Sequence, residues 1–173
     1  MSEILRVLVV TAICLHWVLA CSASTVDDQA PKNAVEVDCE AAAVRDGDSL
    51  AVDCAGVQHE LRLYCIDAPE LAQRPWGNAA RAALLERVDG AALRYETVEE
   101  DDYGRLVARV SVAGIDLAEQ LVREGAAVVY RRYCPAQAAY YTAERSARAA
   151  RLGVWRVEGI HQTPWAYRAA QRR

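Results

Sequence analysis

The chain has 173 residues, of which 53% are hydrophobic and 25% charged, and its formal net charge is −4. This length suits one compact domain with a short extension, and the composition excludes a disordered polyanion and a broadly basic nucleic-acid coat protein. Charge is unevenly placed, because residues 35–102 hold 16 acidic residues and 6 arginines, whereas residues 103–173 hold 12 arginines and 5 acidic residues. This asymmetry can give one face a positive field that steers a phosphate backbone, although solvated arginine-rich helices would produce the same counts.

The N-terminal residues have the features of an export signal. An uncharged apolar stretch at 7–20 is too short for a comfortable membrane span and has the length of a signal-peptide core. It leads into the sequence VLAC ending at Cys21, which resembles the lipobox of bacterial lipoproteins. Cys21 is therefore a candidate lipid anchor, and ordinary cleavage near Ala23 is the alternative.

These features predict three segments along the chain. We expect a signal peptide at 1–21, a flexible tether at 22–34 and a folded, monomeric domain at 35–173. The predicted location is outside the cytoplasm: the periplasm or cell envelope, including an outer-membrane lipoprotein, or the secreted fraction.

The hydrophobic pattern of the domain predicts five strands and three helices. The first three strands are separated by Asp-Gly and Ala-Gly turns, and the helices end at or before glycines. The expected strands are 35–45, 49–54, 58–66, 92–98 and 106–112, and the expected helices are 77–88, 116–125 and 136–151. Three strands, a helix, two strands and two helices predict an α+β, mainly β fold: a five-stranded OB-type Greek-key β-barrel with three helices.

Four cysteines remain after the N-terminal segment: Cys39, Cys54, Cys65 and Cys134. An even number in an oxidising compartment favours two disulfides, and the lack of C-x-x-C spacing argues against a zinc site. If Asp46-Gly47 forms a two-residue turn, Cys39 and Cys54 lie opposite each other as a hydrogen-bonded pair, a match that a bulge would break. By elimination, Cys65 would pair with Cys134.

Histidine chemistry is poorly supported. His16 belongs to the expected signal peptide, and no motif surrounds His59 or His161. We expect both to be surface residues, which argues against a zinc hydrolase or a Ser-His-Asp hydrolase.

Carboxylates and arginines instead gather where strands end. Asp48 follows the first turn, Arg62 lies on a strand that runs into Asp67 and Glu70, and Arg105 precedes the fifth strand. A hard cation prefers oxygen ligands, which Asp48, Asp67 and a backbone carbonyl could supply. Two forked arginines around a phosphate, with a carboxylate that orients a water molecule, are the groups needed for in-line hydrolysis.

Three motifs carry these residues: DGDS at 46–49, RLYCIDAPE at 62–70 and DDYGR at 101–105. Singly each is weak, since Asp-Gly is usually a turn and Tyr-Gly-Arg a loop. In this order and spacing they resemble the staphylococcal nuclease family. The likeness runs from about Val35 to the end of the chain.

The resemblance implies a calcium-dependent endonuclease that hydrolyses DNA and RNA to 3′-phosphate products. Asp48, Asp67 and the carbonyl of Ala68 would bind calcium, and Asp46 would support them. Arg62 and Arg105 would bind the scissile phosphate, and Glu70 would orient or deprotonate the attacking water.

The resemblance also implies tyrosine contacts with the nucleotide, through Tyr103 and through Tyr130 or Tyr133, although packed aromatics would have the same sequence. Ser49 and Ala68 each replace a threonine of the family, and the acidic net charge weakens the expectation of tight binding to long DNA. The alternatives are a non-catalytic OB-fold module that binds nucleic acid or protein, and a structural lipoprotein. Retention of Glu70 favours the nuclease, because a pure binding module does not need it.

Overall fold

The structure is a computed structural model that describes residues 38–135 and 137–172. The expected signal peptide, the candidate lipid anchor Cys21 and the tether lie outside these residues. Within the described part of the chain, no helix has the length and hydropathy needed to cross a membrane.

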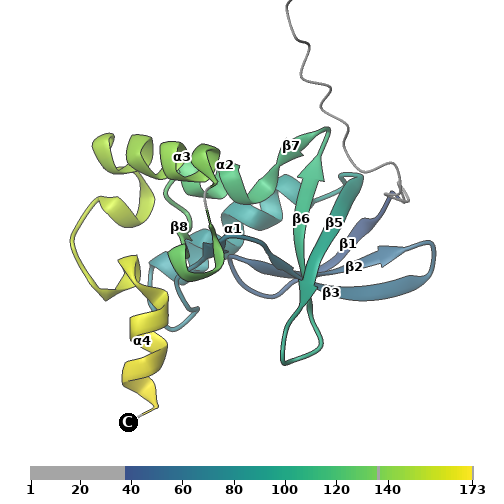
Figure 1. Cartoon of the computed structure of the whole chain (residues 1–173), viewed down its shortest axis with the longest axis horizontal. Helices are drawn as coiled ribbons and strands as arrows, with labels where there is room; N and C mark the ends of the chain where they lie inside the picture. Colours follow the sequence, from purple (N-terminus) through teal and green to yellow (C-terminus); the bar gives the residue numbers. More distant parts are fainter. Residues whose placement is uncertain (1–37, 136, 173) are drawn as a thin grey trace, which may run out of the picture. The chain divides into compact units, whose positions relative to one another are not determined.

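The domain combines short strands with helices that lie between and after them (Figure 1). The strands are β1 (Glu40–Val44), β2 (Ser49–Cys54), β3 (Val57–Leu63), β4 (Ile66–Asp67), β5 (Leu93–Glu100), β6 (Leu106–Val112), β7 (Ile115–Asp116) and β8 (Val128–Val129). The α-helices are α1 (Trp76–Val88), α2 (Leu117–Arg123), α3 (Ala138–Ala149) and α4 (Pro164–Gln171). The 3₁₀ turns are η1 (Arg131–Tyr133), η2 (Gly153–Trp155) and η3 (Ile160–Gln162).

The main sheet has the order β1-β2-β3-β6-β5, with β7 added to β6, and a second small sheet pairs β4 with β8. Its neighbours are antiparallel except for β3 and β6, which run parallel. One antiparallel bridge between Cys39 and Leu93 joins the two ends of this sheet. The α+β, mainly β class is therefore confirmed, and a single bridge in the described residues takes the place of a continuous closing ladder.

The fourth helix was not predicted. Pro164 stands at its first position, where the fixed φ of proline favours a helix start, so a start signal was present. Helices α2 and α3 lie within their predicted ranges, and α1 begins one residue before its predicted start. The predicted third strand instead divides at Tyr64 and Cys65, where Cys65 has a φ of 75°. The chain thereby leaves β3 and pairs β4 with β8, which carries Asp67 away from the main sheet.

The first hairpin pairs Cys39 with Cys54 as expected, but not through a two-residue turn. Its turn is longer than two residues, because Val44 pairs with Leu50, and a bulge between Ala41 and Ala43 then restores the register. The backbone N–H and carbonyl of Cys39 both bond to Leu93, so Cys39 and Cys54 form a non-hydrogen-bonded pair, contrary to expectation. Their Cα atoms are 4.3 Å apart and a disulfide joins them.

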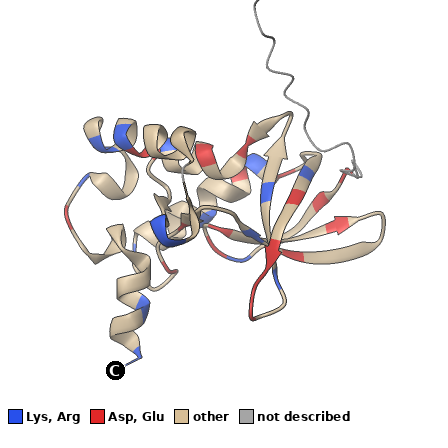
Figure 2. Cartoon of the chain, viewed as in Figure 1, with Lys and Arg blue, Asp and Glu red and all other residues tan. Residues whose placement is uncertain are grey.

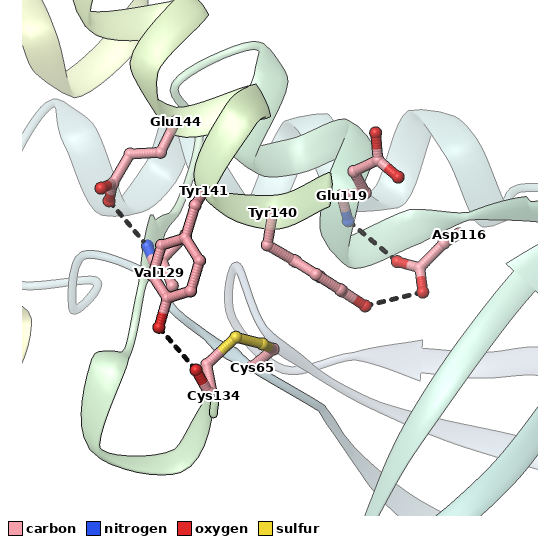
Figure 3. The surroundings of a disulfide bond; sticks show 8 residues. All are labelled: Cys65, Asp116, Glu119, Val129, Cys134, Tyr140, Tyr141 and Glu144. Carbon is pink, nitrogen blue, oxygen red and sulfur yellow. Dashed lines mark hydrogen bonds between the residues drawn. A yellow bond between two sulfur atoms is a disulfide. The ribbon is translucent and has the colours of Figure 1, made fainter. Parts of the chain in front are cut away.

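The second disulfide joins Cys65 to Cys134, the other expected pair, and ties the turn before β4 to the end of η1. Polar contacts from α3 surround it (Figure 3). The hydroxyl of Tyr141 donates to the carbonyl of Cys134 at 2.6 Å, and the buried Glu144 accepts from the N–H of Val129 at 3.0 Å. The helices therefore anchor the small β4–β8 sheet.

The charge asymmetry follows the architecture. Figure 2 shows acidic residues mainly on the strands and their loops, whereas arginines are prominent on η1, α3 and α4. Two of these arginines are partly neutralised, since Arg131 and Arg148 both pair with Glu144.

Candidate active site

The turn before β2 positions Asp48. Asp46 Oδ1 accepts from the backbone N–H of Asp48 at 3.1 Å and from the Ser49 hydroxyl at 2.5 Å, which fixes the turn. A Cβ on Gly47 would lie 2.5 Å from Ala80 of α1 and 2.7 Å from Ala68, so only glycine allows this close approach. Asp48 is consequently held at 3% exposure.

Arg62 joins the two expected metal ligands. Its Nη1 donates to Asp48 Oδ1 and its Nη2 to Asp67 Oδ1, both at 3.1 Å. Asp48 lies in the turn before β2 and Asp67 in β4, and the forked guanidinium of Arg62 bridges them. Asp67 itself is 0% exposed.

The loop after β4 carries Glu70 and packs closely on α1. The backbone N–H of Ala68 donates to Asp48 Oδ2 at 2.8 Å, and that of Glu70 donates to Gln73 Oε1 at 2.9 Å. A Cβ on Gly77 would lie 2.0 Å from the carbonyl oxygen of Glu70. The absence of a side chain at Gly77 therefore lets the Glu70 loop reach its position.

A second arginine, Arg168 of α4, completes the cluster. Its Nη1 lies 3.0 Å from Asp67 Oδ1 and 2.7 Å from Glu70 Oε1, and its Nη2 lies 2.9 Å from Asp67 Oδ2. The structure thus unites Asp48, Arg62, Asp67 and Glu70 as expected from the sequence, and it adds Arg168.

With all three carboxylates ionised, the cluster carries an excess of negative charge, since they face two guanidinium groups. Burial, with repulsion from Asp46 and Asp67, raises the pKa of Asp48 to about 7, against the attraction of Arg62. Burial lowers the pKa of Arg62, but Asp48 and Asp67 raise it above its ordinary value overall. Arg62 therefore stays charged, and a cation bound beside Asp48 would favour the ionised form of its carboxylate.

The donor atoms suit calcium. Asp48 and Asp67 offer hard carboxylate oxygens, and the Ala68 carbonyl lies in the same segment. Among the described residues, no three His, Cys, Asp or Glu side chains form a group that could hold a metal by themselves. A calcium ion would therefore need the backbone carbonyl, water or substrate oxygens in addition to the two aspartates.

Arg105 is not brought into this cluster. Its Nε and Nη2 bind Asp101 Oδ2 at 2.8 and 2.7 Å, in the loop between β5 and β6. Val107 lies directly opposite Arg62 in the parallel β3–β6 pair, and Arg105 precedes Val107 by two residues. Arg105 thus directly precedes the strand that pairs with the Arg62 strand, and its guanidinium is held by Asp101.

The three tyrosines differ in their surroundings. Tyr103 is 84% exposed, beside Arg105, and Tyr133 is also exposed. Tyr130 stacks on Trp165 of α4, with ring centroids 5.1 Å apart, and contacts the edge of Tyr133. Tyr130 is therefore a packed aromatic in this structure, whereas Tyr103 and Tyr133 are open to a ligand.

The expectation that His161 is a surface residue was wrong. It is 7% exposed, stacks on Trp76 at 4.4 Å and places Nε2 2.9 Å from the carbonyl of Val154. Its role is to pack the segment before α4. His59 lies half-buried on β3 near Tyr95, away from the carboxylate cluster.

Sequence reasoning missed Arg168 and Gln73. Gln73 supports the Glu70 backbone from three residues away, a spacing that could have suggested a turn. No local pattern links Arg168 to Asp67, which is 101 positions earlier.

Comparison with known proteins places these motifs in a family. The profile of the family described as staphylococcal nuclease homologue matches residues 60–157. The chain is 36% identical to a probable staphylococcal-like nuclease CAN1 of Oryza sativa subsp. japonica over 66% of this chain and 34% of that protein. It is 32% identical to a micrococcal nuclease of Shigella flexneri over 77% of this chain and 81% of that protein.

A probable endonuclease LCL3 of Schizophyllum commune is 30% identical, over 62% of this chain and 44% of that protein. The chain spans about a third of the length of the rice proteins that it matches.

Proposed function

The chain belongs to the staphylococcal nuclease family, and on that basis we propose that it is a calcium-dependent nuclease that hydrolyses phosphodiester bonds in DNA and RNA. The observation that carries the proposal is the bridge from Arg62 to Asp48 and Asp67, with Glu70 in the same cluster. These are the cation, metal-ligand and base groups that in-line hydrolysis requires. A pure binding module has no need of this combination.

The residues divide the reaction between them. Glu70 accepts a proton from the attacking water as the water oxygen bonds to phosphorus. The bond from phosphorus to the 5′ oxygen of the leaving nucleotide breaks, and that oxygen takes up a proton from solvent. Arg62 and Arg105 stabilise the charge that develops on the phosphate oxygens, Arg105 after it releases Asp101. Asp48, Asp67 and the Ala68 carbonyl would hold calcium, and the bound ion would neutralise charge on the phosphate.

Exposed aromatic rings provide a surface for bases. Tyr103 and Tyr133 are open to solvent, and base stacking on such rings tolerates any sequence. We therefore propose that cleavage depends little on nucleotide sequence and accepts single strands of both sugar types.

Removal and return of the metal tests the proposal directly. Parent protein is incubated with single-stranded DNA and with RNA, with a calcium chelator and then with excess calcium or magnesium. Cleavage that stops with chelator and returns with calcium is expected. No cleavage with calcium present would reject the nuclease proposal and leave the binding module.

Substitution of a metal ligand links that dependence to the site. Asp48→Ala should weaken calcium binding measured by calorimetry, and higher calcium should recover part of the rate. Glu158→Gln, an exposed carboxylate outside the cluster, is the matched control and should leave both measurements unchanged.

We also propose that the domain acts outside the cytoplasm, tethered through Cys21. Two disulfides support an oxidising compartment. Replacement of Cys21 with alanine should block processing or release the protein from the membrane fraction. Unchanged fractionation of that variant would count against the anchor.

A further inference from the structure

Arg168 lies outside residues 60–157, which match the family profile, yet it contacts two groups of the candidate active site. Its guanidinium reaches both oxygens of Asp67 and one oxygen of Glu70. Charge-assisted, forked contacts of this kind constrain orientation as well as supplying energy.

Packing of α4 and the preceding residues fixes the position of Arg168. Trp165 stacks on Tyr130 with an interplanar angle of 7°, and the N–H of Tyr130 donates to the carbonyl of Cys65 at 2.9 Å. Before α4, His161 stacks on Trp76, the first residue of α1. Aromatic contacts therefore seat this segment against both the disulfide-linked turn and the helix that supports the Glu70 loop.

Glu70 needs such support more than the two aspartates do. Asp48 and Asp67 are buried and each binds Arg62, whereas the Glu70 side chain is 35% exposed. Arg168 is the one side chain among the described residues that pairs with the Glu70 carboxylate. Without it, the carboxylate could rotate freely in solvent.

We propose that Arg168 is a positioning residue that orients the carboxylate of Glu70, and that α4 is therefore part of the active site. The proposal rests on the proposed nuclease function. A displaced base lowers turnover more than substrate binding, because only the transition state depends on its alignment.

The principal test compares kcat and KM for a defined single-stranded oligonucleotide at saturating calcium. Arg168→Gln should lower kcat by about 10- to 100-fold, the range found for residues that orient active-site ligands, with KM changed by less than about threefold. Arg168→Lys should recover part of the loss, since an ammonium keeps the positive charge but lacks the paired N–H donors of a guanidinium. Arg172→Gln, at an exposed arginine directly after the same helix, is the matched control.

A double mutant tests whether Arg168 acts through Glu70. In the Glu70→Gln background, Arg168→Gln should cause no further loss of kcat, because the group being oriented is already disabled. An independent, multiplicative loss would overturn the proposal. Trp165→Leu, which loosens the seat of α4 while retaining Arg168, should lower kcat in the same direction.

Two readouts do not depend on turnover. The melting temperature of Arg168→Gln should stay well above the assay temperature, so that unfolding does not explain the loss. The calcium affinity of Arg168→Gln should change by less than about tenfold. Loss of the positive charge strengthens calcium binding, whereas a less constrained Asp67 weakens it. Much tighter calcium binding with faster cleavage would overturn the proposal and show that Arg168 blocks the site.

The remaining outcomes separate the two proposals. A raised KM with unchanged kcat would overturn positioning and make Arg168 a substrate-binding group. A variant as fast as the parent would overturn the inference while the nuclease function stands. An inactive parent would reject the nuclease function itself.

Discussion

At the scale of single residues, the three carboxylates of the site differ in burial and in their cationic partners. Asp67 is fully buried and accepts hydrogen bonds from Arg62 and Arg168, so it is fixed and charge-compensated. Asp48 is buried with Arg62 as its only cationic partner among the described residues. Glu70 is more exposed and has one side-chain partner, which suits a group that must meet water.

Glu70→Gln is expected to separate binding from chemistry. The amide keeps the size of the side chain but cannot act as a base, so turnover at saturating calcium should fall by about 10²- to 10⁴-fold. Calcium and oligonucleotide affinity, measured by calorimetry, should stay near the parent values. Glu86→Gln, an exposed glutamate on α1, serves as the control. Turnover of Glu70→Gln within a few-fold of the parent would show that Glu70 is not the base.

At the scale of elements, α1 fixes the position of the loop that carries Glu70. Gly47 and Gly77 allow backbone approach that any Cβ would prevent, and both contacts involve α1. The helix thereby positions the Asp48 turn and the Glu70 loop relative to each other.

Gly77→Ala should disturb this arrangement. Its Cβ would meet the backbone of Glu70 and Leu71 at less than 3 Å, so the loop must move. We expect about 1 to 3 kcal/mol of destabilisation in urea unfolding, as for other overpacked sites, together with reduced turnover. Asn78→Ala, exposed on the same helix, should change neither. Parent-like stability and turnover in Gly77→Ala would show that close packing on α1 does not position the Glu70 loop.

The disulfides should contribute unequally to stability. Cys65–Cys134 spans 69 residues and Cys39–Cys54 spans 15, and the entropy that a crosslink removes from the unfolded chain grows with loop length. Double alanine replacement should cost about 4 kcal/mol for the longer loop and about 3 kcal/mol for the shorter. Urea unfolding of the two variants measures the difference, and the reverse order would contradict the prediction.

At the scale of the whole molecule, acidic strands adjoin arginine-bearing helices within a chain of net charge −4. Such a molecule can bind phosphates locally while it repels long polyanions elsewhere. Substrate binding should therefore involve few phosphate contacts.

The dependence of binding on salt measures that number. With about three phosphates contacted, the logarithm of the affinity for a single strand should fall with the logarithm of salt concentration at a slope near −2. Titrations of Glu70→Gln with a labelled oligonucleotide in calcium at several salt concentrations give the slope. A slope steeper than about −5 would indicate a broad basic interface instead.

The sequence alone determined the features that local pattern encodes. Alternation and turn residues located the main strands, helical periodicity located α1, α2 and α3, and motif spacing identified the family and brought together Asp48, Arg62, Asp67 and Glu70. The cysteine pairs also followed from the sequence, although the longer turn and the compensating bulge did not, because a bulge depends on how the strand fits its neighbours.

Only the tertiary structure decided where Arg168 and Arg105 direct their charges. Arg168 meets Asp67 across 101 positions because aromatic stacking seats α4, and such a contact has no local signature. Arg105 belongs to a family motif, yet its guanidinium binds Asp101, because the loop between β5 and β6 places that carboxylate nearby. Motifs specify residue types and spacing, whereas the geometry of a charged side chain depends on which partners packing brings within hydrogen-bond distance.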